Sequence, residues 1–158
     1  MPSPTAPLLD LLDQAYGSKR AWHGTALKGA LRGVTPAEAL RRPGSGRHNI
    51  WELVIHIAYW KYAVTRLLLG IKRGGFPRTP ANWPDVPAKP EQRAWRADLA
   101  LLDAQHQALR RAVAALPAAH LKRKAKGRWT FAELVVGVGA HDMYHLGQIQ
   151  LIKRLVSR

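Results

Sequence analysis

The feature that most constrains the fold of this chain is a helical spacing of its apolar residues over four stretches. Residues three, four and seven positions apart are apolar there, and no segment shows the period-two alternation of a β-strand convincingly. Segments rich in proline and glycine separate the stretches, which extend over about Ala6–Arg32, Asn49–Gly70, Pro90–Leu116 and Thr130–Leu155. The sequence therefore predicts an all-α fold, a four-helix bundle.

Capping signals mark the ends of three of these helices. Asn49 with Glu52, and Thr130 with Glu133, have the residue types and the spacing of a capping box. In that motif each of the two side chains accepts a hydrogen bond from the backbone N–H of the other residue. A proline opens the third helix and Pro117 follows its end, as is common at helix termini.

The first helix has the weakest pattern, because Gly17 and Gly24 interrupt it. Its core-facing residues are predicted to be Leu8, Leu9, Leu12, Tyr16, Leu27 and Leu31. The connector that follows has a possible short turn at residues 36–41 and glycine and proline breakers after it.

A long segment rich in proline and glycine, residues 71–89, separates the second and third helices. Loops of this length in compact domains are usually functional or connect distant ends of a fold. About 18 residues span up to roughly 60 Å, whereas a 22-residue helix is about 33 Å long. The segment can therefore cross over the length of the bundle, which makes helices two and three parallel and helices two and four antiparallel.

Length and composition indicate one domain over residues 1–158. The chain has no apolar run of about 18 residues and no basic segment followed by an apolar one at its start, so we expect neither a membrane span nor a signal peptide. It has no cysteine, which excludes disulfides, thiolate ligands and a cysteine nucleophile. We expect a cytoplasmic protein.

The formal net charge is +15. Such a charge attracts anions, among them nucleic acids, phosphorylated or carboxylated small molecules and acidic partners. The basic residues are scattered, however, and the densest group, residues 120–128, falls in a predicted loop. A basic solvated surface therefore accounts for this pattern better than a dedicated anion site.

Two histidines in the fourth helix, His141 and His145, are four residues apart and therefore lie on one face. His56 is roughly 10 Å from the start of the second helix, and His145 is roughly 15 Å before the end of the fourth. With these helices antiparallel, the three histidines come to the same level. Three neutral imidazoles can bind Zn²⁺, Ni²⁺ or Fe²⁺ and leave coordination positions open. The alternative is that they are hydrogen-bonded core residues.

A metal-ligating histidine usually donates its second ring N–H to a fixed acceptor. The candidates near enough in sequence are Glu52, Tyr59, Asp142 and Gln148. Asp142 falls on a different helical face from the two histidines, where it is either solvated or a partner of a ligand. His106 and His120 are predicted to lie on the surface, and His23 and His48 at the metal end of the bundle.

Other catalytic patterns fit poorly. The string from His141 to His145 is similar to the zinc-protease motif H-E-x-x-H, but aspartate replaces the glutamate and no third ligand follows. The chain has no Glu-x-x-His motif of a di-iron bundle, no G-x-S-x-G, no P-loop and no dinucleotide-binding fingerprint. A site with one metal and three histidines remains.

The stretches "NIWELVIHIAYWKYAV" and "AHDMYHLGQIQLIKR" resemble the DinB-like superfamily, which includes the DinB/YfiT proteins and the bacillithiol- and mycothiol-dependent transferases. The likeness covers nearly the whole chain. It implies a four-helix bundle with one long crossover and a metal bound by one histidine of the second helix and two of the fourth. Those positions correspond to His56, His141 and His145.

The resemblance also implies a function, a metal-dependent S-transferase that joins a low-molecular-weight thiol to an electrophile. Such a thiol is anionic, and Arg47, Lys61 or Arg93 would supply the complementary charge. Trp22, Trp83 and Trp95 are candidate walls of the pocket, with ordinary core packing as the alternative. Relatives often pair through bundle faces, so a homodimer is expected.

The alternative function is a non-enzymatic basic protein of the stress response, with nucleic acid as its partner and a structural metal or none. No recognised nucleic-acid motif is present, and no helix has a basic stripe with interleaved aromatic residues. The sequence therefore favours the enzyme.

Overall fold

The computed structural model describes residues 3–17, 21–125 and 127–156. Within these ranges the chain is all-helical and contains no strand. The elements are α1 (Ala6–Tyr16), α2 (Leu27–Leu31), α3 (Pro36–Leu40), α4 (Ile50–Leu69), α5 (Gln92–Ala114), the 3₁₀-helix η1 (Ala118–His120) and α6 (Phe131–Val156). The predicted all-α class is confirmed.

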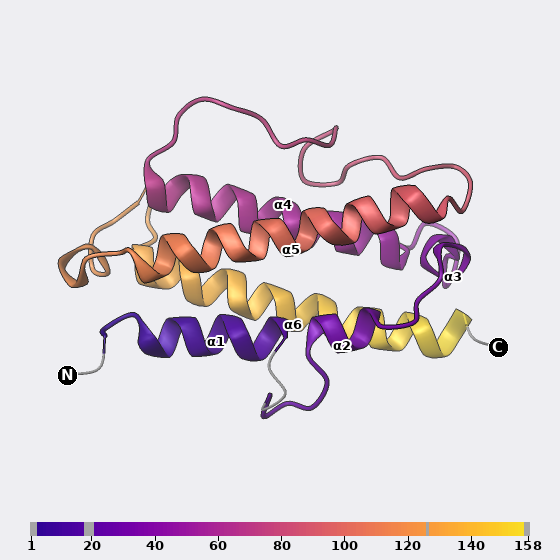
Figure 1. The fold of residues 1–158 in the computed structure, drawn as a ribbon, viewed down its shortest axis with the longest axis horizontal. Coiled ribbons are helices and arrows are strands. Elements are labelled where there is room, and N and C mark those ends of the chain that lie inside the picture. The colour runs from indigo at the N-terminus through magenta and orange to yellow at the C-terminus, as the bar shows by residue number, and fades with distance from the viewer. Residues whose placement is uncertain (1–2, 18–20, 126, 157–158) are drawn as a thin grey trace.

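The first predicted helix is wrong in its middle, because α1 ends at Tyr16 and α2 begins only at Leu27. Gly24 has a φ of +100°, a value that no α-helix contains and that glycine accepts readily. Residues 18–20 of the predicted helix lie outside the described part of the chain. Figure 1 shows α1 and α2 end to end along α6, so together they occupy the place of one bundle helix.

The predicted capping boxes are both formed. The Asn49 side chain accepts a hydrogen bond from the backbone N–H of Glu52 at 2.9 Å, and α4 begins at the next residue after Asn49. The Thr130 hydroxyl accepts from the backbone N–H of Glu133 at 3.2 Å, at the start of α6. Gly70 ends α4 in the left-handed conformation with a φ of 65°.

The segment between α4 and α5 crosses over the outside of the bundle from the end of one helix to the start of the other (Figure 1). As a result α4 and α5 run parallel, and α6 runs antiparallel to α4. The topology predicted from the length of this segment is therefore confirmed. It places the first half of α4 beside the second half of α6.

The core consists of two apolar clusters, one around Trp51 and Trp95 and one around Leu109 and Val135. Between the two clusters, α4 and α6 contribute polar residues instead: His56, Lys61, His141, Asp142 and His145. None of the helices in the described residues is both long and apolar enough to cross a membrane. The polar layer thus separates the two apolar clusters of the core.

Candidate metal centre

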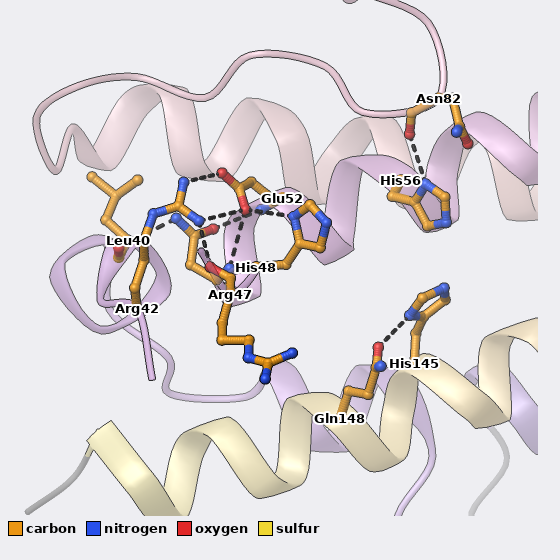
Figure 2. Close-up of polar contacts among 10 residues, drawn as sticks. Leu40, Arg42, Arg47, His48, Glu52, His56, Asn82, His145 and Gln148 are labelled. Carbon is orange, nitrogen blue, oxygen red and sulfur yellow. Dashed lines mark hydrogen bonds and ion pairs between the residues drawn. The ribbon is translucent and has the colours of Figure 1, made fainter. Parts of the chain in front are cut away.

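Three histidines meet in this polar layer. His56 comes from α4, and His141 and His145 come from successive turns of α6. The Nε2 atom of His141 lies 3.1 Å from Nε2 of His56 and 3.0 Å from Nε2 of His145. The three ligand atoms all lie within 4.8 Å of one another. Figure 2 shows His56 and His145 pointing toward each other from the facing helices.

Hydrogen bonds on the far side of two rings determine which nitrogen carries the proton. Nδ1 of His56 lies 2.6 Å from the backbone oxygen of Asn82, and Nδ1 of His145 lies 2.6 Å from Oε1 of Gln148. An amide oxygen only accepts, so Nδ1 donates in both cases. A neutral imidazole protonated at Nδ1 has a lone pair at Nε2. Two lone pairs therefore face the ring of His141.

This donor set fits a divalent metal. In a tetrahedral zinc site with Zn–N distances of about 2.0–2.1 Å, two ligand nitrogens are roughly 3.3 Å apart, close to the 3.0 and 3.1 Å found here. A proton on Nε2 of His141 could be donated to only one of the two facing nitrogens, those of His56 and His145. The other nitrogen would be left without a hydrogen-bond donor. A cation among the three nitrogens satisfies all of them.

The histidines are in the protonation state that a metal requires. Burial lowers the pKa of His56 to about 4, and the nearby His145 and His48 act in the same direction. Burial likewise lowers the pKa of His141 to about 3, with further contributions from the other two histidines of the triad. Burial also lowers the pKa of His145. All three imidazoles are therefore neutral at pH 7 and able to donate a lone pair.

Residues 20–149 match the family model of the DinB superfamily. The chain belongs to the DinB superfamily. No curated protein and no solved structure matches it significantly. The resemblance seen in the helices around His56 and His141 is thereby confirmed, whereas the reaction is not identified by any relative.

Two hollows lie beside the triad of this DinB-superfamily chain. One, of about 640 Å³, lies over the second half of α6 and the connector before α4, and its lining includes Arg47, His48 and Gln148. The other, of about 280 Å³, is mostly apolar and is lined by Trp60, His141 and neighbouring residues of α4 and α6. The apolar hollow thus reaches the triad through His141. The Arg47 hollow, the more polar of the two, reaches it through Gln148, the partner of His145, and is called the polar hollow below.

Of the four candidate partners for the ring nitrogens, the structure places only Gln148 against a triad histidine. Glu52 is elsewhere: its carboxylate accepts from the backbone N–H of Asn49, pairs with Arg42 and lies 2.9 Å from Nδ1 of His48 (Figure 2). Tyr59 packs edge-on against Trp60 and against Phe76 of the crossover. Both side chains are engaged one turn away from the metal site.

The predicted pocket tryptophans differ in position. Trp83 stacks on His56 with ring centroids 3.8 Å apart, and on His48 at 3.7 Å, so it does wall the site. Trp22 is 94% exposed and contributes nothing to a pocket at the triad, because its segment lies outside the helices. Trp95 is buried in the core, where its indole N–H donates to the backbone oxygen of Val34 at 3.0 Å.

Asp142 lies on a different face of α6 from the histidines, as predicted, but it is neither solvated nor a partner of a ligand. It is fully buried and pairs with the equally buried Lys61 of α4. Burial raises the pKa of Asp142 against the opposite effect of the Lys61 charge. His106 was predicted to lie on the surface, and that is wrong: it is buried, with Nδ1 3.4 Å from Nζ of Lys61.

Sequence reasoning missed two functional contributors. Asn82 is in the crossover, where no periodic pattern predicts which residue will approach the triad. Its only signal is its residue type, since it adopts a left-handed φ of 71° that asparagine tolerates better than most residues. Trp60 of α4 is 39% exposed and walls the apolar hollow, a role that its residue type and spacing do not indicate.

Proposed function

We propose that this chain is a metal-dependent thiol S-transferase of the DinB superfamily. The observation that carries the proposal is the convergence of three neutral imidazole nitrogens, one of them on the wall of an apolar hollow. In the reaction a thiol sulfur forms a bond to an electrophilic carbon, the bond from that carbon to its leaving group breaks, and the thiol proton departs with the leaving group.

The three histidines would hold Zn²⁺, Ni²⁺ or Fe²⁺, which lowers the pKa of a thiol placed at its open coordination position. The residues around the triad keep it ready for that ion. Asn82 and Gln148 hold the protons of His56 and His145 on the outer nitrogens. The Trp83 ring covers one face of His56 and so excludes water from it.

The charge that attracts an anionic thiol is best supplied by Arg47. Of the three basic residues considered, Lys61 is fully buried and paired with Asp142. Arg93 is exposed in the first turn of α5 and lines neither hollow beside the triad. Arg47 lines the polar hollow, and its side chain extends from the connector toward α6 (Figure 2). An anionic group of the thiol would bind there.

The first test is the metal content of untagged protein beside the variants His56→Ala and His145→Ala, with His23→Ala as the control. His23 is exposed and belongs to no metal-binding group in the described residues. We expect near-stoichiometric metal in the control and none in the two triad variants, with helical content unchanged in all. Absence of metal after addition of Zn²⁺, Ni²⁺ and Fe²⁺ would reduce the histidines to core residues and refute the proposal.

The second test is thiol consumption with bacillithiol or mycothiol and an alkyl halide. We expect turnover in metal-loaded protein, loss of turnover with a chelator and recovery when metal is restored. If the metal-loaded protein consumes neither thiol, the S-transferase proposal is refuted and the metal has a structural role.

The homodimer expected from the family resemblance stays a prediction. An uncharged stripe along the outer face of α6 supports it, formed by Val136, Ala140, Tyr144, Gly147 and Leu151, all of them exposed. On a chain with a net charge of +15, two copies approach with least repulsion through a face without charges. Sedimentation equilibrium decides between monomer and dimer.

A further inference from the structure

The apolar hollow beside the triad is a formed pocket. Its walls come from the second half of α4, from the residues just before α6 and from the first part of α6, and its lining is Trp60, Val64, Trp129, Glu133, Leu134, Gly137, Val138 and His141. Two indole rings, those of Trp60 and Trp129, are among these walls. His141, whose Nε2 lies at the centre of the triad, connects the pocket to the metal centre.

One residue fixes both the pocket and the triad. The side-chain oxygen of Asn82 accepts a hydrogen bond from the indole N–H of Trp60 at 2.9 Å, while its backbone oxygen accepts from His56. Trp60 is partly exposed, and this bond holds its ring in place against solvent. The pocket wall and the metal ligand are therefore positioned together.

Size limits what the pocket can hold. A cavity of roughly 150 Å³ is enough for benzene, and drug-sized ligands occupy roughly 300–1,000 Å³. The volume of about 280 Å³ thus suits one substituted ring or a short branched chain. It is too small for a helix or a folded partner.

Charge separates the two hollows. The apolar pocket contains one ionic group, the Glu133 carboxylate, which already accepts hydrogen bonds from the backbone N–H and the hydroxyl of Thr130. Arg128 lies over the Trp129 ring, 4.3 Å from its centroid, but does not line the pocket. The Glu133 carboxylate would repel an anion, whereas a neutral apolar group would enter the pocket without electrostatic repulsion.

Resting on the S-transferase function proposed above, we propose that this pocket binds the electrophile, and that the substrate class is neutral electrophiles with an aromatic or branched aliphatic body. The thiol with its anionic groups occupies the polar hollow near Arg47. The two substrates then reach the metal centre from two separate hollows, and the reacting carbon lies next to His141.

Gly137 offers a way to close the pocket without disturbing the fold. It lies within α6, and a Cβ built on it meets no other atom within 4 Å, so neither packing nor backbone conformation requires glycine there. A leucine at this position fills the pocket, and leucine is a better helix former than glycine. Gly75 of the crossover has the same free space and lines neither hollow, which makes Gly75→Leu the control.

The experiment measures binding of 4-nitrobenzyl alcohol, a neutral aromatic probe, to full-length protein stripped of metal. The readout is the set of indole N–H resonances, assigned with Trp60→Phe and Trp129→Phe. We expect shifts concentrated on Trp60 and Trp129, a dissociation constant at least about tenfold higher in Gly137→Leu, and a change below about twofold in Gly75→Leu. Equal affinity in the two glycine variants, or larger shifts at other tryptophans, would overturn the inference.

Metal-loaded protein supplies the second readout. With 4-nitrobenzyl chloride and a thiol, Gly137→Leu should raise KM for the chloride and leave KM for the thiol unchanged; a rise in the thiol KM instead would overturn the assignment. The binding arm needs no metal, so it is independent of the metal analysis that tests the S-transferase proposal. A protein that binds metal and consumes thiol but does not bind 4-nitrobenzyl alcohol would refute the pocket assignment and leave the S-transferase proposal intact.

Discussion

Two polar clusters lie side by side in the interior of this bundle, the Lys61–Asp142 pair and the histidine triad. They differ in how their buried polar groups are compensated. His141 and Asp142 are consecutive residues of α6, yet one faces His56 and the other faces Lys61, both on α4. The Lys61–Asp142 pair contains both signs of charge and neutralises itself. His56 and His145 both present a lone pair to His141, which can donate a proton to only one of them, so a cation from outside can complete that cluster. The difference between the two clusters is therefore one of charge: the pair is balanced within itself, whereas the lone pairs of the triad are not.

The largest effect should come from breaking the self-contained cluster. Replacing Lys61 by methionine leaves the Asp142 carboxylate buried without its partner, and removal of one member of a buried pair costs about 3–5 kcal/mol. Urea unfolding in the presence of a chelator measures this loss in the free energy of unfolding. We expect the metal content of the folded protein to stay unchanged.

The double variant Lys61→Met/Asp142→Leu is the control, because it removes both charges and keeps the volume apolar. It should regain most of the lost free energy, since buried pairs are often replaced by apolar residues at little cost. If Lys61→Met alone lowers the free energy of unfolding by less than about 1 kcal/mol, Asp142 is protonated and neutral in the variant. Its raised pKa would permit that state.

Gln148→Leu should have a smaller effect, which is confined to the metal affinity of the histidine triad. This change removes the acceptor that holds the proton of His145 on Nδ1. Loss of such an outer partner typically weakens metal affinity about 10–100-fold. Competition with a chromophoric chelator measures the affinity, and Gln150→Leu on the same helix is the matched control. Equal affinities in the two variants would contradict the role of Gln148.

The smallest effect concerns pH and the far edge of the Lys61 cluster. His106 stacks on Tyr16 at 3.8 Å, and burial, followed by the charge of Lys61, lowers its pKa to about 3, although Asp13 and Asp103 act in the opposite direction. The unfolded chain takes up a proton at this residue near pH 6.5 and the folded chain does not, so folding loses stability as the pH falls below 6.5.

At pH 5 this contribution of His106 amounts to about 2 kcal/mol relative to pH 7. His106→Phe keeps a ring against Tyr16 and removes the titration. The variant should therefore lose about 2 kcal/mol less than the wild type between these two pH values, measured by urea unfolding in chelator. Parallel pH profiles of the two proteins would mean that His106 is protonated in the fold.

The bundle and the histidine triad were predictable because both depend on patterns that are local in the sequence. Asn49 with Glu52 and Thr130 with Glu133 fix where two helices begin, and the length of the crossover fixes their relative direction. Those facts alone bring His56 to the level of the two histidines of α6. No contact between distant residues had to be known.

The surroundings of the triad depend on tertiary contacts and were predicted poorly. Charged residues are normally assumed to be solvated or to assist a ligand, so Asp142 was expected in one of these two roles. Only its register against Lys61 shows that it is buried in an ion pair. Glu52 has the residue type of a partner for a ligand, but the cap of α4 already uses its carboxylate. The path of the crossover has no periodicity, and the position of Asn82 therefore required the structure.

The antiparallel pairing of α4 and α6 has a consequence for how the chain is held together. His56 and His141 are 85 positions apart, and the sequence contains no cysteine. A metal bound by both would close a loop of that length, and a covalent cross-link over a loop of about 100 residues removes about 4.7 kcal/mol of chain entropy from the unfolded state. The ion would thus act as a reversible staple between the second and the last long helix, opened by a chelator and closed again by metal.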